Sequence, residues 1–337
     1  MTSTLLTVAD VSKVFTGRRK SAFSKPTEIH ALNRVSLDID KGTTLGVVGE
    51  SGCGKSTLGR VVVGAHEATS GSVHLKLDSI SNPITPLTMR KNRDLRQQLQ
   101  LVFQDPHSSF NPRMTVEESI SEPLVCLTTL PSRQRSKRVL DLLDMVGIPK
   151  SAVNRYPSAF SGGQRQRLSI ARALATEPAL IVADEPVSAL DVSVQAQIVN
   201  LFLQLQKDIG LSYLFISHDL GVVRHVSDRI VVMYLGRIVE TADASELFDR
   251  PTHPYTRLLI DSLPGSRDGA RPAGHMTRSE VPDASVRQQG CPFRPRCAFA
   301  QEVCARKNPQ LTPRPQGLTG EVACHSPLPT TRTEGTE

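Results

Sequence analysis

Residues 49–56 read Gly49-Glu50-Ser51-Gly52-Cys53-Gly54-Lys55-Ser56, which fits the pattern G-x-x-x-x-G-K-[ST]. The short apolar run Thr44-Leu45-Gly46-Val47-Val48 precedes this stretch, and a helix-compatible segment from Lys55 to Gly64 follows it. Glycines let the backbone curl so that several N–H groups point at one oxyanion, and the start of a helix adds the positive end of its dipole. The sequence therefore predicts a strand, a phosphate-binding loop and a helix, in that order.

The side chains of this loop predict ATP and Mg²⁺ as its ligands. Lys55 is expected to reach the β- and γ-phosphates, the Ser56 hydroxyl to ligate Mg²⁺, and Thr57 to help hold the phosphates. The other expected ATP-binding residues are Gly49, Ser51, Gly52, Cys53 and Gly54. The alternative is a glycine-rich turn with a chance lysine, which the flanking strand and helix disfavour.

An acidic pair follows a second apolar run. Ala179-Leu180-Ile181-Val182-Ala183 leads directly into Asp184 and Glu185. A carboxylate at the end of a buried parallel strand emerges at the edge of the sheet where ligands bind. We expect Asp184 to steady Mg²⁺ through its water shell and Glu185 to act as general base on the attacking water. The alternative is a solvated acidic pair at the end of a strand.

Phe160-Ser161-Gly162-Gly163-Gln164 predicts a second anion site. Ser161 and Gln164 have the spacing of an S-x-x-Q capping box at the start of a helix. The two glycines leave backbone N–H groups uncovered at the positive end of that helix. The alternative is a well-capped helix without a ligand.

The same five residues resemble the LSGGQ signature of ABC ATPases, with Phe160 in place of the leucine. The resemblance implies an α/β P-loop cassette with a RecA-like core, an antiparallel β subdomain and a helical subdomain. It also implies that two cassettes pack head to tail. Ser161, Gly162, Gly163 and Gln164 would then close over the ATP of a partner chain.

Further motifs of this family follow in the expected order. Phe103-Gln104-Asp105-Pro106 resembles the Q-loop, which implies that Gln104 touches Mg²⁺ or water and links the core to the helical subdomain. Ser188-Ala189-Leu190-Asp191 resembles the D-loop between two cassettes, and His218 matches the switch histidine that contacts the γ-phosphate. Phe15 falls where the family places an aromatic side chain on adenine, although a phenylalanine of the core is a common alternative.

Within the family, the phosphate loop, Asn111-Pro112-Arg113 and His253-Pro254-Tyr255-Thr256 resemble the F-type ATPases of dipeptide and oligopeptide importers. The resemblance implies a D-type partner ATPase, two transmembrane permease subunits and an extracytoplasmic peptide-binding protein. Nickel and glycoside importers use close relatives, so either cargo is an alternative to peptide. A soluble ABC ATPase that acts on nucleic acid is the rival class, but such proteins usually carry two cassettes in one chain.

Composition supports a peripheral membrane role. The chain has 337 residues, a formal charge of +7 and no tryptophan, and only 4% of its residues are aromatic. The chain therefore has few aromatic side chains on which bases could stack, and we expect no nucleic-acid partner. No apolar run approaches the roughly 20 residues of a membrane-spanning helix. Any membrane role is therefore expected to be peripheral, and the resemblance to importer ATPases implies a place on the cytoplasmic side of the cell membrane.

The sequence divides into a nucleotide-binding domain at 1–255 and a C-terminal extension at 256–337. A helical subdomain is expected at about 90–175, and the basic segment Arg18–Thr27 is interpreted as a surface insertion. Apolar periodicity fades in the extension, where prolines accumulate, so we expect it to build no large core.

Four cysteines gather in the extension, at Cys291, Cys297, Cys304 and Cys324. Without a secretion signal such a cluster indicates metal rather than disulfides. The tight Cys pairs of structural zinc sites are missing. This wider spacing, together with the resemblance of the tail to peptide-importer ATPases, favours a [4Fe–4S] cluster, with zinc or free thiols as alternatives. Because these cysteines lie far from the phosphate motifs in sequence, we expect them to have a structural role.

Overall fold

The computed structural model describes residues 3–17, 27–77, 80–105, 109–263 and 289–329. An eight-stranded sheet forms its centre, in the order β11-β12-β10-β9-β3-β8-β7-β6, and β9, β3, β8, β7 and β6 are parallel. The prediction of an α/β core is confirmed. The strands of this sheet are β3 (Thr44–Val48), β6 (Leu99–Val102), β7 (Leu180–Asp184), β8 (Ser212–Ile216), β9 (Arg229–Tyr234), β10 (Arg237–Asp243), β11 (Thr312–Pro313) and β12 (Glu321–Val322).

The central strands are apolar throughout because both of their faces are covered. In β7, Leu180 and Val182 pack into one hydrophobic core while Ile181 and Ala183 pack into the other. Successive side chains of a strand point to opposite faces, so a doubly covered strand needs apolar residues at every position. The apolar runs at 44–48 and 179–183, which the sequence predicts to be strands, form β3 and β7.

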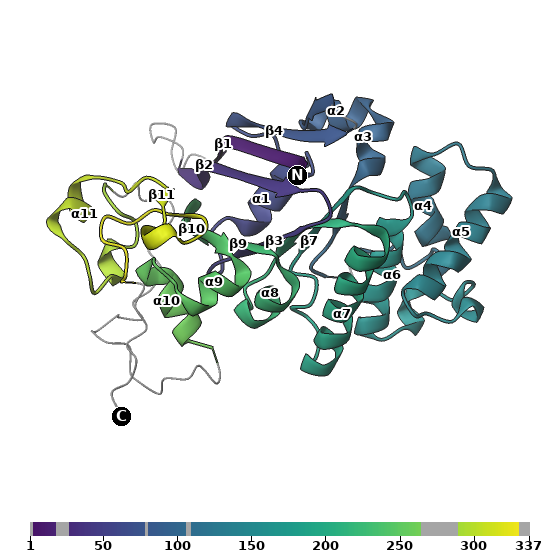
Figure 1. The fold of residues 1–337 in the computed structure, drawn as a ribbon. Coiled ribbons are helices and arrows are strands. Elements are labelled where there is room, and N and C mark those ends of the chain that lie inside the picture. The colour runs from purple at the N-terminus through teal and green to yellow at the C-terminus, as the bar shows by residue number, and fades with distance from the viewer. Residues whose placement is uncertain (1–2, 18–26, 78–79, 106–108, 264–288, 330–337) are drawn as a thin grey trace.

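A second, antiparallel sheet covers one face of the core. Its order is β2-β1-β4-β5, and Figure 1 shows it above α1, with the core strands β3, β9 and β7 below. This sheet is the antiparallel β subdomain that the sequence predicted. Its strands are β1 (Thr4–Thr16), β2 (Glu28–Asp40), β4 (Ser70–Leu77) and β5 (Ile80–Pro83). The predicted insertion at Arg18–Thr27 lies almost wholly outside the described residues.

Helices cover both faces of the core sheet and form a lobe at one end. Figure 1 shows α4, α5 and α6 together at the right and α8, α9 and α7 below the sheet. The helices are α1 (Lys55–Val62), α2 (Pro86–Lys91), α3 (Arg93–Gln98), α4 (Val116–Leu127), α5 (Ser132–Met145), α6 (Gly162–Leu174), α7 (Val192–Ile209), α8 (Leu220–Val226), α9 (Ala244–Asp249), α10 (Pro254–Asp261) and α11 (Glu302–Arg306).

The predicted helical subdomain needs a correction at its start. Residues 99–102, which fall inside the expected span of about 90–175, form β6 and pair in parallel with β7. They belong to the core sheet and not to the helical lobe. Leu99-Gln100-Leu101-Val102 is too short to stand out among helical neighbours, because its strand conformation depends on a partner about 80 residues further along the chain.

Two short strands of the C-terminal extension belong to the core sheet, which the sequence did not predict. β12 pairs with β10, with Val322 opposite Glu240, and β11 pairs with β12. Phe293 packs into the larger hydrophobic core. The expected domain boundary after residue 255 also falls inside α10. The described part of the extension, 289–329, is therefore held by strand pairing and by packing against the nucleotide-binding domain.

No helix in the described ranges is long and apolar enough to cross a lipid bilayer.

Candidate functional site: a phosphate loop and three motifs around Glu185

The phosphate loop connects β3 to α1, as the sequence predicted. Gly54 has φ +107°, and a Cβ atom there would lie 2.3 Å from the Ala31 carbonyl oxygen, so only glycine fits. Lys55 is buried, and its Nζ donates hydrogen bonds to the carbonyl oxygens of Gly49 (2.7 Å) and Glu50 (3.0 Å). In this arrangement the ammonium group is held inside the curve of the loop, where an incoming phosphate would meet it.

Ser56 at the start of α1 meets the acidic pair at the end of β7. The Ser56 hydroxyl donates a 2.9 Å hydrogen bond to Oδ1 of Asp184. Burial raises the pKa of Asp184, the hydrogen bond from Ser56 acts in the opposite direction, and the charge of Glu185 raises it further. Hydroxyl and carboxylate oxygens are ligands that Mg²⁺ prefers. The donor set therefore fits the ion that the sequence predicted at this place.

Three motifs that are distant in sequence meet at one carboxylate oxygen. Oε2 of Glu185 accepts a 3.0 Å hydrogen bond from Nε2 of Gln104 and lies 3.2 Å from Nδ1 of His218. Glu185 has φ +49°, a left-handed conformation that costs a non-glycine residue roughly 1–3 kcal/mol. Such strain persists only where the surroundings impose it. Here the strained turn directs the carboxylate away from β7 and towards the two other side chains.

The Ser161-Gly162-Gly163-Gln164 segment begins α6 with the predicted capping box. The Ser161 hydroxyl accepts a hydrogen bond from the Gln164 N–H at 3.3 Å, and the Gln164 amide oxygen accepts one from the Ser161 N–H at 3.0 Å. A Cβ atom at Gly163 would lie 2.3 Å from Val194 of α7, so a larger residue would push the two helices apart. Ser161 and Gln164 are exposed, so this helix start faces outward.

The predicted D-loop is also on the surface. Asp191 directly precedes α7 and is exposed, and the neighbouring Val192 has 82% of its surface accessible. Leu190 packs against the larger hydrophobic core and fixes the base of this loop. An exposed valine beside an exposed carboxylate has no role in the packing of the chain itself.

Phe15, the predicted adenine contact, lies near the end of β1 and is only partly buried. Its ring meets His66 edge to face with centroids 5.5 Å apart, and Lys13 lies 5.0 Å from its centre. Phe15 belongs to neither hydrophobic core. The alternative of a core phenylalanine is therefore excluded, while the adenine contact stays a prediction.

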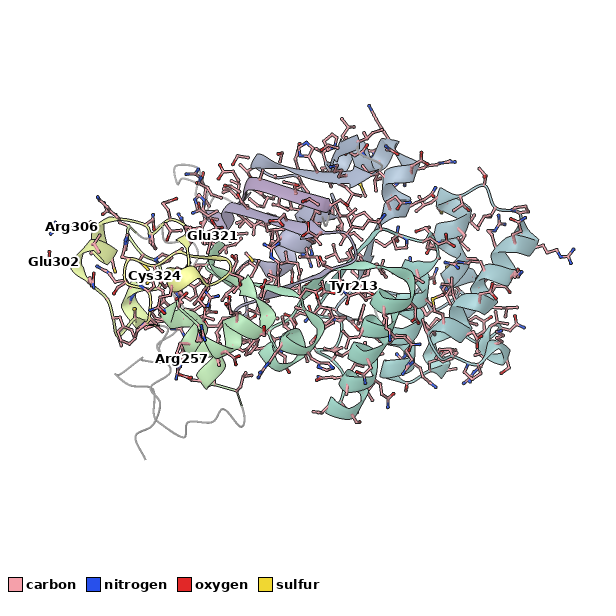
Figure 2. All side chains as sticks on the ribbon, viewed as in Figure 1. Tyr213, Arg257, Glu302, Arg306, Glu321 and Cys324 are labelled. Atoms are coloured by element: carbon pink, nitrogen blue, oxygen red, sulfur yellow. The ribbon has the colours of Figure 1, made fainter. Side chains whose placement is uncertain are left out.

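The four cysteines of the extension share one region, and Figure 2 shows Cys324 inside it. Burial raises the pKa of Cys291 and Cys297 and brings that of Cys324 to about 12, and the charges of neighbouring thiols add to each increase. The Cys291 N–H also donates a 2.7 Å hydrogen bond to the Cys304 carbonyl oxygen. Within the part of the chain that the structure describes, however, no three His, Cys, Asp or Glu side chains form a group that would hold a metal ion.

Sequence reasoning missed two residues that form hydrogen bonds with Glu50 of the phosphate loop. The Tyr255 hydroxyl accepts a 2.9 Å hydrogen bond from the Glu50 N–H, and Arg296 forms a two-fold ion pair with the Glu50 carboxylate. Tyr255 belongs to the His253-Pro254-Tyr255-Thr256 motif, whose function the sequence left unexplained. Arg296 carries no sequence signal, because its partner is 246 residues away.

These features define an ATP-binding cassette, and comparison with known proteins agrees. A model of the ABC transporter family matches residues 32–188, and one of the oligopeptide/dipeptide transporter C-terminal region matches residues 239–304. The oligopeptide transport ATP-binding protein AppF of Bacillus subtilis is 44% identical over 96% of this chain and 97% of its own. The dipeptide transport ATP-binding protein DppF of Haemophilus influenzae is 43% identical over 91% of this chain and 92% of its own.

A solved ATP-binding cassette, a dimer in a post-hydrolysis state with ADP and phosphate, aligns with a TM-score of 0.61. It is 29% identical and covers 71% of this chain and 99% of its own. The chain belongs to the ABC transporter family. Within that family it belongs to the ATP-binding proteins of the DppF and AppF type, and residues 239–304 match the oligopeptide/dipeptide transporter C-terminal region.

Proposed function

We propose that this chain binds and hydrolyses ATP as one half of a cassette pair and that hydrolysis powers peptide uptake across the cell membrane. The observation that carries the proposal is the meeting of Gln104, Glu185 and His218 beside the Ser56–Asp184 pair. Mg²⁺ would be held by Ser56, by Gln104 and, through water, by Asp184, and it would neutralise charge on the phosphates.

Glu185 is suited to be the general base. Its Oε2 accepts a hydrogen bond from Gln104 and lies near His218. A water molecule beside these three side chains would be oriented by them and would lose its proton to the Glu185 carboxylate. His218 is exposed at the end of β8 and would face the γ-phosphate. Lys55 would leave the carbonyl oxygens that it now contacts and bind the β- and γ-phosphates.

The second cassette of the pair is proposed because the signature helix start faces outward. Ser161 and Gln164 are exposed, as are Asp191 and Val192 of the D-loop. Their N–H groups and side chains would close over the ATP of a D-type partner, and the partner's signature would close over this phosphate loop. Hydrolysis should then rise more steeply than linearly with chain concentration, or require the partner. Full activity of a dilute monomer would contradict the two-chain site.

Two permease subunits are the proposed membrane partners, which would place the chain on the cytoplasmic face of the membrane. A hollow of about 370 Å³ lies between the core and the helical lobe, lined in part by Phe103, Pro123 and Leu127. Phe103 is 50% exposed and directly precedes Gln104, so a permease segment in this hollow would act on the catalytic region. Phe103→Ser should abolish co-purification with the permease subunits, whereas Ile80→Ser on the exposed edge of β5 should not.

Peptide is the proposed cargo, and an extracytoplasmic peptide-binding protein would deliver it. Relatives of this type are named for oligopeptide or dipeptide transport, which favours peptide over nickel or a glycoside. Uptake of labelled di- and oligopeptides by vesicles that contain the assembled transporter would test this cargo. Uptake of nickel or a glycoside instead would change the cargo but leave the ATPase assignment intact. Specific co-purification with nucleic acid in place of a permease would favour the rival class.

We also propose that Cys291, Cys297, Cys304 and Cys324 bind one metal centre, which we assign to a [4Fe–4S] cluster. The support is the electrostatic proximity of the thiols and the number of soft ligands. Binding would deprotonate these thiols and require a local rearrangement of their side chains. Anaerobically purified protein should be brown and contain about four irons per chain. If the purified protein contains one zinc per chain and no iron, the site is a zinc site. If it contains no metal, the four cysteines are free thiols.

A further inference from the structure

Every polar group of Glu50, the second residue of the phosphate loop, has a partner. Its N–H donates to the Tyr255 hydroxyl at 2.9 Å, and its carbonyl oxygen accepts from Lys55 Nζ at 3.0 Å. Its carboxylate accepts two hydrogen bonds from the Arg296 guanidinium, at 2.7 and 2.8 Å. Two of these partners, Tyr255 and Arg296, lie outside the loop and come from the C-terminal part of the chain. Both contact the loop through Glu50.

Arg296 is itself fixed in place. Only 6% of its side chain is exposed, and its guanidinium lies 5.8 Å from the ring centre of Tyr234 and 5.7 Å from that of Phe293. A two-fold ion pair between a shielded arginine and a carboxylate has a defined geometry that a surface pair lacks. The Glu50 side chain is 26% exposed, so solvent screens this pair only in part.

The backbone that carries Arg296 is the segment between Cys291 and Cys297. The Arg294 N–H donates to the Cys291 carbonyl oxygen at 3.1 Å, and the Cys297 N–H donates to the Arg294 carbonyl oxygen at 3.2 Å. Arg296 ends the short 3₁₀ turn Arg294–Arg296 and is followed directly by Cys297. Anything that fixes or releases these two cysteines therefore changes the backbone that aims Arg296 at the phosphate loop.

From this arrangement we propose that Arg296 is a positioning residue of the ATP site, through which the cysteine-bearing extension controls ATP affinity. The proposal rests on the ATP binding proposed above. Glu50 is a negative charge in a loop that must receive the polyanionic end of ATP. Its pairing with Arg296 neutralises that charge and holds the loop in its curved form. Without Arg296 the unpaired carboxylate would repel the phosphates.

The first experiment measures ATP affinity of the purified full-length chain by calorimetry, together with its thermal unfolding. Arg296→Gln should weaken ATP binding by about tenfold, the effect of a like charge held near the phosphates. Arg296→Lys should recover part of the loss because it restores the charge without the two-fold geometry. Wild-type affinity in Arg296→Gln would overturn the proposal.

The double variant Glu50→Gln/Arg296→Gln separates this electrostatic role from a merely structural one. It removes the unpaired carboxylate, so ATP affinity should return towards the wild-type value. This should hold even if the lost ion pair lowers the unfolding temperature of both variants. A purely structural contact predicts that the double variant binds ATP as poorly as Arg296→Gln or worse. That outcome would overturn the positioning role.

A matched control is available in the same extension. Arg306 pairs with Glu302, and the two side chains are 78% and 90% exposed, at the outer edge of the extension in Figure 2. Arg306→Gln removes an arginine of the extension without touching the loop and should leave ATP affinity unchanged.

Lys55→Ala serves as the reference for lost phosphate contact. If wild-type protein and Lys55→Ala bound ATP equally poorly, the proposed function would fail, and that result differs from any expected of Arg296.

The second experiment tests the cysteine segment. Cys297→Ser should weaken ATP binding in the wild-type background, because it loosens the turn that carries Arg296. The same substitution should have no further effect in the Glu50→Gln/Arg296→Gln background, where the ion pair is gone. This expectation goes beyond the one drawn from sequence, which gave the cysteines a structural role. An unchanged affinity in Cys297→Ser, or an equal loss in both backgrounds, would overturn the link between the extension and the ATP site.

Discussion

Glu185 and Glu240 are two carboxylates of the same sheet that the chain uses in opposite ways. Glu185 follows β7 at the ligand-binding edge, its side chain is 15% exposed, and its neighbours Gln104 and His218 lie on the surface. Glu240 lies within β10 and is fully buried. It accepts hydrogen bonds from Thr252 and His253 and pairs with Arg314, which is equally buried.

The difference shows what separates a reactive carboxylate from a structural one. The Glu185 side chain is partly accessible to water, and its partners Gln104 and His218 are exposed. The Glu240 carboxylate is occupied by the N–H and hydroxyl groups of Thr252, by the N–H group of His253 and by Arg314 of the extension. Removing a partner from Glu185 should therefore change the reaction, and removing one from Glu240 should change stability.

The largest effect is expected at Glu185. Glu185→Gln should lower the ATPase rate of the assembled transporter by about 10²- to 10⁴-fold, because the amide cannot accept the proton of the attacking water. ATP binding should persist, so closed ATP-bound pairs should accumulate. Phosphate release and nucleotide binding measure the two properties separately. Lys55→Ala is the contrasting variant, since it should weaken binding itself. Near-wild-type hydrolysis by Glu185→Gln would show that another group is the base.

At Glu240 the corresponding change is in the free energy of unfolding. Arg314→Met leaves a fully buried carboxylate without its ion-pair partner and should cost about 3–5 kcal/mol in urea unfolding. Arg257→Met is the control, because Arg257 forms only a half-exposed pair with Asp261 and should cost at most about 0.5 kcal/mol. If Arg314→Met does not fold, Glu240→Gln/Arg314→Met should recover part of the stability. If Arg314→Met and Arg257→Met lowered the free energy of unfolding equally, Glu240 would not be a structural carboxylate in the sense proposed.

Asp184 is a third case beside Glu185 and Glu240. Burial disfavours its charge, as at Glu240, but no ion pair among the described residues compensates for it. Its pKa is raised above the unfolded value, so ionisation in the nucleotide-free protein costs stability as the pH rises through that range. Asp184→Asn should therefore leave the unfolding temperature at neutral pH unchanged or raise it. With Mg-ATP at 100 times its dissociation constant, wild-type protein should gain about 2.7 kcal/mol, and Asp184→Asn should lose most of that gain. A marked loss of stability without nucleotide would give Asp184 a structural role.

The smallest effect at neutral pH concerns His253, whose N–H donates a hydrogen bond to the buried Glu240 carboxylate. Burial lowers the pKa of His253 to about 3, and its Nδ1 accepts a 3.0 Å hydrogen bond from the Tyr255 N–H. The unfolded chain binds a proton below about pH 6.5 and the native chain does not, so stability falls as the pH decreases from there towards 3. His253→Asn, which keeps a side-chain cap, should reduce this slope by at most about 1.4 kcal/mol per pH unit. An unchanged slope would contradict this role.

Much of the site could be predicted because its residues sit in short motifs next to strand and helix ends. β3 matches the predicted strand Thr44–Val48, and the Ser161–Gln164 capping box forms as its spacing indicates. Gln104, Glu185 and His218 come from three separate motifs, yet they meet because the carboxyl ends of neighbouring parallel strands share one edge of the sheet. In each case the local pattern already contains the physical cause of the placement.

The sequence by itself therefore determined the class of protein, the phosphate loop, the acidic pair and the signature helix. Only the tertiary structure decided that β6 joins the core sheet, that the extension continues it through β12, and that Arg296 holds the phosphate loop. Each of these contacts joins residues about 80 or more positions apart, and its energy depends on burial and on a partner that no local pattern specifies. An arginine in a proline-rich tail looks like a solvated charge until the fold places a carboxylate opposite it and removes the water.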